Sequence, residues 1–217
     1  MSKFQAIIFD MDGLLVDSET VWEHAEIQLI EARGRRFDKS MREQVMGMRM
    51  DEFFPKLREL FDLEDSVETL YAELVGNMLT LIPERATAMP GAAELLEYVV
   101  ENQIPCAIAS GSPAEIIECV VTSRGWAEVF PMRISADTVA RGKPAPDVFL
   151  ETARQLDVDP AGCLVLEDSP NGARAAQAAG MTCYAVADPR HIRPEAFAGI
   201  TDHVFNSLHD VLAELRM

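Results

Sequence analysis

The sequence has little positive charge, with 19 lysine and arginine residues against 36 aspartate and glutamate residues and a formal net charge of -17. Nucleic acids and anionic membrane surfaces attract basic patches, so this balance argues against both as partners. Most of the negative charge is expected to serve solubility. If the ligand is an anion, a bound cation and a local lysine must reverse the potential at its site.

Cysteine pairs and long apolar runs are also missing. The four cysteines, Cys106, Cys119, Cys163 and Cys183, include no Cys-x-x-Cys pair, so we expect reduced thiols packed as apolar residues. No apolar stretch approaches the roughly 20 residues of a membrane span, and the N-terminus has no signal-peptide pattern. We therefore expect a cytoplasmic protein, and a monomer.

The order of the predicted elements indicates an α/β fold. At 217 residues the chain is long enough for one core domain and a smaller second unit. An apolar run over residues 4–9 predicts a buried strand. After the Pro90-Gly91 pair, helical stretches alternate with further strands, which we expect at residues 104–109, 132–135, 162–166 and 182–186. Such a series predicts a Rossmann-like, doubly wound parallel sheet with helices on both faces.

A helical insert separates the first strand from the rest of this sheet. Between Ser18 and Thr87 the pattern is helical and contains no convincing strand. We expect a first helix that stops near Gly34 and further helices over residues 39–46, 51–61 and 66–82, with Pro83 marking the return to the sheet. The predicted domains are a core of residues 1–17 and 88–217 and a four-helix cap of residues 18–87. Hinges at residues 14–18 and 83–90 would let the cap close over a site.

Two aspartates directly follow the first strand, in the segment Asp10-Met11-Asp12-Gly13. Open α/β sheets bind ligands just beyond the carboxyl ends of their strands. In an extended stretch, side chains two positions apart share a side, so a turn at Gly13 can aim both carboxylates at one group. The same pattern is also a common turn sequence, and alone it is a weak signal.

Three further segments place polar residues where strands or loops end. Ser110 and Gly111 follow one apolar run, Lys143 lies between Gly142 and Pro144 at the start of a helical stretch, and Glu167-Asp168 end another strand. Together they offer a hydroxyl and backbone N–H groups for phosphate, an ammonium group, and acids for a hard cation.

Each segment also has a structural interpretation. Glu167 and Asp168 could only cap the helix expected over residues 170–179, and Lys143 could be an ordinary surface lysine. We interpret Ser112, which precedes Pro113, as the N-cap of the helix over residues 113–123.

In this combination and order, the segments resemble the haloacid dehalogenase-like phosphohydrolases. The resemblance runs nearly end to end and is strongest to the branch with β-phosphoglucomutase and the small sugar-phosphate and hexitol-phosphate phosphatases. It implies that Asp10 is the nucleophile and Asp12 the general acid/base. It also implies that Ser110, with Gly111, and Lys143 hold the phosphate.

The resemblance also implies a metal site at Asp168 and Glu167. Asp10, Asp12 and these two acids cannot crowd together in ionised form without a counter-charge. Mg²⁺ prefers oxygen ligands and bridges to phosphate, so we expect it on the side chains of Asp10 and Asp168 and the backbone carbonyl of Asp12. No cysteine and histidine cluster accompanies the acids, which argues against zinc.

One position separates this chain from the mutases of the family. They carry a histidine twelve positions after the nucleophile, where this chain has Trp22. His24 lies about 200° around the helix from that position and should point elsewhere. The paired basic cap residues of the mutases are also not clearly matched, and Arg49 is the only good candidate. Trp22 could form an apolar wall for a substrate or pack in the cap, and Arg49 could bind substrate or solvent.

These departures favour a Mg²⁺-dependent phosphatase that acts on a small phosphorylated sugar, sugar alcohol or hydroxy acid. The main alternative is a β-phosphoglucomutase-like mutase. A phosphoacceptor signalling module also uses an aspartate at a strand end, and a hydrolytic dehalogenase also uses an aspartate nucleophile. Neither of these needs Asp12.

Overall fold

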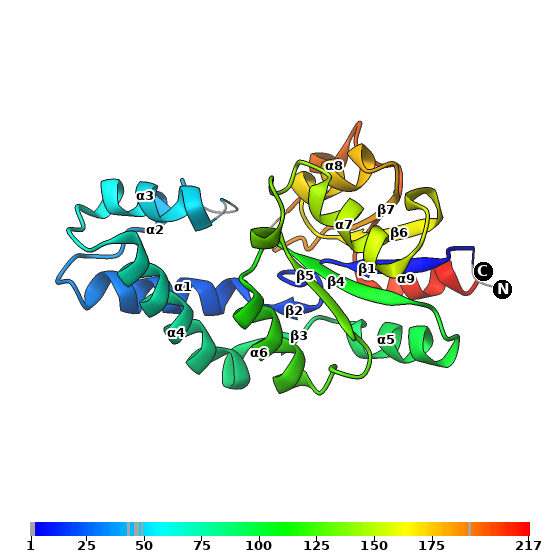
Figure 1. The fold of residues 1–217 in the computed structure, drawn as a ribbon, viewed down its shortest axis with the longest axis horizontal. Helices are drawn as coiled ribbons and strands as arrows, with labels where there is room; N and C mark the ends of the chain where they lie inside the picture. The colour runs from blue at the N-terminus through cyan, green and yellow to red at the C-terminus, as the bar shows by residue number, and fades with distance from the viewer. Residues whose placement is uncertain (1–2, 43, 46–47, 49, 191) are drawn as a thin grey trace.

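The structure is a computed structural model that describes residues 3–42, 44–45, 48, 50–190 and 192–217. Within these residues, six strands form one parallel sheet in the order β5-β4-β1-β6-β7-β8 (Figure 1). They are β1 (Ala6–Phe9), β4 (Cys106–Ser110), β5 (Met132–Ser135), β6 (Cys163–Glu167), β7 (Thr182–Val186) and β8 (Val204–Phe205). The doubly wound sheet predicted from the sequence is confirmed. Strand β8 was not predicted, because two residues are too few to show a pattern.

Alternate side chains of the central strand face opposite layers of helices. Ile7 and Phe9 of β1 point into one hydrophobic core, whereas Ala6 and Ile8 belong to the core on the other face. Helices α5 (Ala92–Glu101), α6 (Ala114–Arg124) and α9 (Leu208–Leu215) cover the first face, and α7 (Asp147–Leu156) and α8 (Pro170–Ala178) cover the second (Figure 1). Apolar side chains on both faces thus hold β1, and the residues that follow it, at the centre of the fold.

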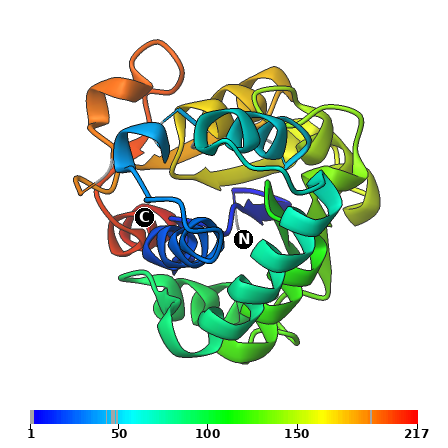
Figure 2. The same ribbon diagram turned by 90° about the vertical axis from the view of Figure 1, so that its left-hand side faces the viewer.

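The insert packs beyond the end of the sheet, as Figures 1 and 2 show. Its helices are α1 (Glu19–Glu31), α2 (Lys39–Arg42), α3 (Met50–Phe61) and α4 (Val67–Arg85). The helices expected over residues 51–61 and 66–82 are confirmed to within a few residues. The helix expected over residues 39–46 was too long, because α2 ends at Arg42 and residues 44 and 45 form a turn; residues 43 and 46 lie outside the described residues.

Pro83 does not end helix α4, so the expected return to the sheet at this proline was wrong. The helix runs on to Arg85. Proline has no N–H to bond the carbonyl of Leu79 one turn earlier. The thiol of Cys119 on α6 lies 3.7 Å from that carbonyl oxygen, and Arg124 donates to the Pro83 carbonyl at 2.8 Å. Packing against α6 therefore satisfies backbone groups at the proline.

Two short strands join the insert to the sheet. Strand β2 (Val16–Asp17) pairs with β3 (Thr87–Ala88) in an antiparallel ladder. The sequence predicted hinges here but no strands. Arg190, which follows β7, donates to the Asp17 carboxylate at 2.8 Å, and its guanidinium also lies 3.7 Å from the sulfur of Met89. A loop of the core thus contacts both connections to the insert.

All four cysteines are free thiols, as expected. Cys106, Cys163 and Cys183 are buried, and burial raises the pKa of Cys106 to about 12. In the part of the chain that the structure describes, none of the helices has the length and hydropathy needed to cross a membrane.

Candidate active site

The motif residues meet at the carboxyl ends of the central strands. Asp10 follows β1, Ser110 ends β4, and Glu167 ends β6, with Asp168 directly after it. Because β1 lies between β4 and β6, these residues line one cavity of about 420 Å³. Lys143 reaches the same cavity from the loop before α7. The sequence suggested that the segment around Lys143 begins a helix. Instead this segment forms a turn ahead of α7.

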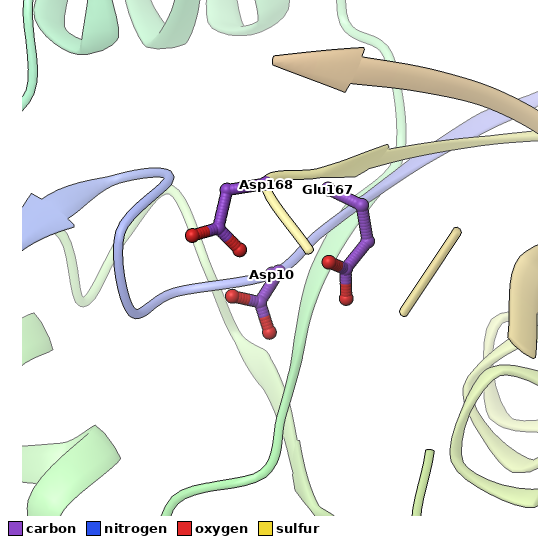
Figure 3. Close-up of side chains that lie close together, drawn as sticks. All are labelled: Asp10, Glu167 and Asp168. Carbon is purple, nitrogen blue, oxygen red and sulfur yellow. The ribbon is translucent and has the colours of Figure 1, made fainter. Parts of the chain in front are cut away.

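The carboxylates of Asp10, Glu167 and Asp168 converge (Figure 3), and one oxygen of each lies within 4.8 Å of the others. Burial raises the pKa of Asp10 to about 8. The charge of Lys143 opposes this rise, whereas those of Glu167 and Asp12 add to it. Burial, followed by the charges of Asp10 and Glu167, also raises the pKa of Asp168. Three acids share one lysine here, so a further cation would be needed for all three to stay charged.

The donor set and the space around it fit a hard divalent cation. Three carboxylates supply oxygen ligands of the kind that Mg²⁺ prefers. Gly13 has a φ of 76°, and a β-carbon there would collide with the Asp168 carboxylate. A β-carbon at Gly172 would collide with the Glu167 carboxylate. Both glycines thus let the backbone approach the acids closely.

Lys143 is fully engaged with this acidic group. Its Nζ donates to Asp10 Oδ1 and Glu167 Oε1, both at 2.6 Å, and to the backbone carbonyl of Ala109 at 3.1 Å. Burial alone would lower the pKa of Lys143, but the charges of Asp10 and Glu167 outweigh it and raise that pKa. The ammonium is therefore held beside the predicted nucleophile and is not an ordinary surface lysine.

Asp12 is separate from the acidic group and accepts four side-chain hydrogen bonds. Its Oδ1 accepts from Ser18 Oγ at 2.7 Å and from Trp22 Nε1 at 3.3 Å. Its Oδ2 accepts from Ser110 Oγ at 3.1 Å and from Ser112 Oγ at 2.7 Å. The donors come from both the insert and the sheet, so this carboxylate lies where the two meet.

This arrangement corrects the interpretation of Ser112 as a helix N-cap. The N-cap of α6 is Pro113, whose side chain makes no capping bond, and the Ser112 hydroxyl turns to Asp12 instead. Because α6 begins at Ala114, Ser112 lies one residue before the N-cap position, and its hydroxyl donates to the Asp12 carboxylate in a charge-assisted hydrogen bond.

The structural interpretation of Glu167 as a helix cap is only partly right. Ser169 is the N-cap of α8, and its side chain accepts from the Gly172 N–H. Glu167 Oε2 accepts from the backbone N–H and the hydroxyl of Ser169, at 3.0 and 2.9 Å. One Glu167 oxygen thus fixes the turn before the helix, while the other faces Lys143.

The remaining predicted residues have mixed outcomes. Trp22 and Gly111 line the cavity, and His24 is exposed with its Nδ1 2.6 Å from the Thr20 carbonyl, so it points away as expected. Arg49 lies outside the described residues. Sequence reasoning missed Glu26, a buried residue of the cavity wall. Its position one helical turn after Trp22 was the available signal.

Known proteins resemble this chain in sequence. The sequence pattern of the haloacid dehalogenase-like hydrolases matches residues 7–186. A probable pseudouridine-5'-phosphatase of Drosophila melanogaster is 35% identical over 196 residues, covering 88% of this chain and 84% of the relative. Hexitol phosphatase B of Escherichia coli (strain K12) is 32% identical over 214 residues, covering 96% and 95%.

The fold has solved counterparts as well. The crystal structure of a putative β-phosphoglucomutase from Thermotoga maritima superimposes with a TM-score of 0.80 at 27% identity, covering 98% of each chain. The family match, the phosphatase relatives and this fold together show that the chain belongs to the haloacid dehalogenase-like hydrolases, in the branch of sugar-phosphate and hexitol-phosphate phosphatases and β-phosphoglucomutase-like proteins.

Proposed function

We propose that the protein is a Mg²⁺-dependent phosphatase that hydrolyses a small phosphorylated sugar or sugar alcohol through an aspartyl-phosphate. The observation that carries the proposal is that Asp10 accepts a hydrogen bond from the Lys143 ammonium and converges with the acids Glu167 and Asp168. The relatives named as phosphatases of pseudouridine 5'-phosphate and of hexitol phosphates support the substrate class.

In the proposed reaction, Asp10 attacks phosphorus in line with the leaving oxygen. The phosphorus–oxygen bond to the substrate breaks, and Asp12 gives its proton to the departing alkoxide. Asp12 then takes a proton from the water that attacks the aspartyl-phosphate. Inorganic phosphate leaves and the Asp10 carboxylate is restored.

The surrounding residues would hold the phosphate and balance its charge. Bound Mg²⁺ would offset the negative charge of the acids and the phosphate, with ligands from the side chains of Asp10 and Asp168 and the backbone carbonyl of Asp12, beside Glu167. Lys143 brings a second positive charge to the phosphate. The Gly111 N–H, ahead of helix α6, would donate to a phosphate oxygen, and the Ser110 hydroxyl, which donates to Asp12 in this structure, would turn to donate to another.

The cap would close the site. We propose that residues 18–87 form a cap domain over a core of residues 1–17 and 88–217, and that the β2–β3 pair is the hinge. The cavity wall on the insert side includes Trp22 and Phe53, which suit the carbon skeleton of a sugar or polyol. Arg49 would bind a further hydroxyl or anionic group. We propose that the enzyme works as a monomer, in a reducing compartment such as the cytoplasm, which its free cysteines support.

A phosphate-release screen over phosphorylated metabolites tests the proposal. Pseudouridine 5'-phosphate, hexitol phosphates and glycerol 3-phosphate head the panel, and each is assayed with Mg²⁺ and with a chelator. We expect release that needs Mg²⁺ and is lost in Asp10→Asn, while Asp202→Asn, a change at an exposed carboxylate outside the cavity, keeps it. Release that survives full chelation would reject the mechanism.

A β-phosphoglucomutase-like activity is the second candidate, favoured by the similarity to the T. maritima structure. This chain has Trp22 where the mutases carry a histidine, so we expect that nothing reserves the aspartyl-phosphate for a sugar hydroxyl. Incubation with β-glucose 1-phosphate and a catalytic amount of the bisphosphate should therefore yield free phosphate and little glucose 6-phosphate. Efficient formation of glucose 6-phosphate would favour the mutase.

A further inference from the structure

We propose that Ser135, at the end of strand β5, is a positioning residue for the loop after β4 that holds the substrate phosphate. The inference rests on the proposed role of Ser110 and Gly111 as phosphate donors. Ser135 donates a hydrogen bond to the backbone carbonyl of Ser112 at 2.7 Å, and so fixes the chain directly after Gly111. Its neighbour Ala136 lines the cavity, whereas Ser135 itself does not.

Gly111 depends on its neighbours for its position. It is exposed, and a β-carbon added to it would meet no atom within 4 Å beyond its two chain neighbours, so no packing restrains it on that side. Ser110 and Ser112 on either side are buried. Because glycine has the greatest backbone freedom of any residue, its N–H keeps one direction only if the adjoining peptide groups are held.

Three hydrogen bonds hold Ser112, one at each of its polar groups. Its N–H donates to Ser110 Oγ at 3.0 Å, its hydroxyl donates to Asp12 at 2.7 Å, and its carbonyl accepts from Ser135 Oγ at 2.7 Å. In the proposed reaction Ser110 turns to the phosphate and Asp12 changes its protonation state, whereas Ser135 has no step to perform. The Ser135 hydrogen bond can therefore hold the loop through a complete turnover.

The hydroxyl of Ser135 is itself held in one orientation. Strands β4 and β5 are parallel with Ser110 opposite Ser135, which places this hydroxyl level with the loop. Ser135 Oγ accepts from the N–H of Asp137 at 3.1 Å, in the short 3₁₀ helix η1 (Ala136–Thr138), so its own proton is directed to the Ser112 carbonyl. Ser135 is only 2% exposed, so removal of its hydroxyl would leave a buried carbonyl without this partner.

The Ser112 carbonyl is the group that makes this restraint matter for an anion. A carbonyl oxygen carries partial negative charge, and one that turned toward a bound phosphate would repel it. While Ser135 holds that oxygen at β5, the loop presents the Gly111 N–H to the site. Loss of the hydrogen bond should therefore weaken binding of the phosphate group itself, whatever alcohol it is attached to.

Ser135→Ala tests the proposal, with inorganic phosphate as the probe. In the Mg²⁺-loaded protein, ¹⁵N–¹H spectra recorded during a phosphate titration give the dissociation constant, which we expect to rise about tenfold, the size of one hydrogen bond. Thr152→Val is the matched control. Thr152 is also buried and donates to a backbone carbonyl, that of Val148, at 2.7 Å, but it lies in α7 outside the cavity. In this variant the dissociation constant should stay within about twofold.

A graded variant keeps the test open if Ser135→Ala does not fold. Ser135→Cys replaces the hydroxyl by a thiol, which is a weak hydrogen-bond donor. The dissociation constant for phosphate should then rise about threefold, less than with alanine. A folded Ser135→Cys protein that binds phosphate as tightly as the unmodified protein would contradict the proposal.

A purely structural role gives a different result. If Ser135 only caps η1, its substitution should lower the thermal stability and leave the affinity for phosphate unchanged. That outcome would overturn the proposal and leave the proposed phosphatase in place. A protein that releases phosphate from no substrate, but in which Ser135→Ala still weakens phosphate binding, would keep the positioning role and reject the proposed function.

The same spectra test the loop without any ligand. Gly111→Ala identifies the amide signal of Gly111, and the open space around that residue accommodates the added methyl group. In phosphate-free protein, Ser135→Ala should shift the Gly111 signal, and Thr152→Val should leave it in place. A Gly111 signal that Ser135→Ala does not move would overturn the proposal.

Discussion

The proposed cap and core each contain one partly buried cation that bonds two carboxylates, and the comparison separates a stabilising contact from a chemical one. In the cap, Arg33 makes two hydrogen bonds to Asp65, at 2.9 and 3.0 Å, and two to Glu73, at 3.1 and 2.7 Å. In the core, Lys143 contacts Asp10 and Glu167 at 2.6 Å each. Each group thus pairs one basic side chain with two carboxylates.

Their exposure to water differs. The side chains of Asp65 and Glu73 are 31% and 37% exposed, whereas those of Asp10 and Glu167 are 8% and 1% exposed. The hydrogen bond from Arg33 lowers the pKa of Asp65, but burial raises the pKa of Asp10 despite its lysine. In the cap, water and the arginine together satisfy the acids. The core excludes water and adds Asp168, and so leaves excess negative charge for a further cation.

The largest expected effect follows from removing the carboxylate that the core group surrounds. Asp10→Asn should lower phosphate release more than about 1,000-fold, because an amide neither attacks phosphorus nor binds the metal as a charged ligand. The fold should persist, because the oxygen of the new amide can still accept a hydrogen bond from Lys143. The charge of Glu167 remains to balance that lysine. Steady-state assays and circular dichroism would check both points. Substantial activity in folded Asp10→Asn would contradict the proposed nucleophile.

The second-largest expected effect is a rise in the free energy of unfolding when Mg²⁺ binds the acids around Lys143, which the acids around Arg33 should not produce. Mg²⁺ at 100 times its dissociation constant should raise the free energy of unfolding by about 2.7 kcal/mol, since it binds only the folded acids. Thermal denaturation with Mg²⁺ and with a chelator measures this. The rise should largely disappear in Asp168→Asn and persist in Arg33→Ala, whose change lies in the cap. An equal rise in all three proteins would place the metal elsewhere.

The core group was open to prediction from sequence because each member ends a recognisable segment. Asp10 follows a short apolar strand, and Glu167-Asp168 end another. Parallel strands bring such ends to one edge of the sheet, so local patterns were enough to place Asp10 and Glu167 together. The fold followed for the same reason, since the alternation of strands and helices is visible along the chain.

The cap group and the bonds of Asp12 were not open to such prediction. Arg33, Asp65 and Glu73 come together only when α1 packs against α4, and nothing in their spacing marks them as partners. Ser112 was assigned to the wrong task because its neighbour Pro113 looks like a helix start. Side-chain hydrogen bonds between distant segments depend on packing geometry, which residue patterns do not encode.

The cap contact should matter for stability and little for chemistry. Arg33→Ala leaves two acids beside each other without their shared donor, and we expect a loss of about 1–3 kcal/mol in the free energy of unfolding. Urea denaturation measures it. Arg35→Ala removes an exposed ion pair to Asp62 from the same region and should cost less. The kcat/KM of folded Arg33→Ala should stay within about tenfold of the unmodified protein, since the acids at Lys143 are untouched.

The smallest expected effect is the pH dependence of that stability difference. Hydrogen bonding to Arg33 lowers the pKa of Asp65 below its ordinary value of 3.8, so the folded state binds a proton there less readily than the unfolded chain. A carboxylate of this kind contributes stability above its unfolded pKa and loses the contribution as the pH falls through the folded value. The difference in unfolding free energy between the unmodified protein and Arg33→Ala should therefore be constant from about pH 7 to 5 and shrink below about pH 4.

Urea titrations across this range measure it, and in Asp65→Asn the same comparison should lose much of its pH dependence. A difference that grew as the pH fell would show that Asp65 is not stabilised in its charged form, and the contrast with Asp10 would fail.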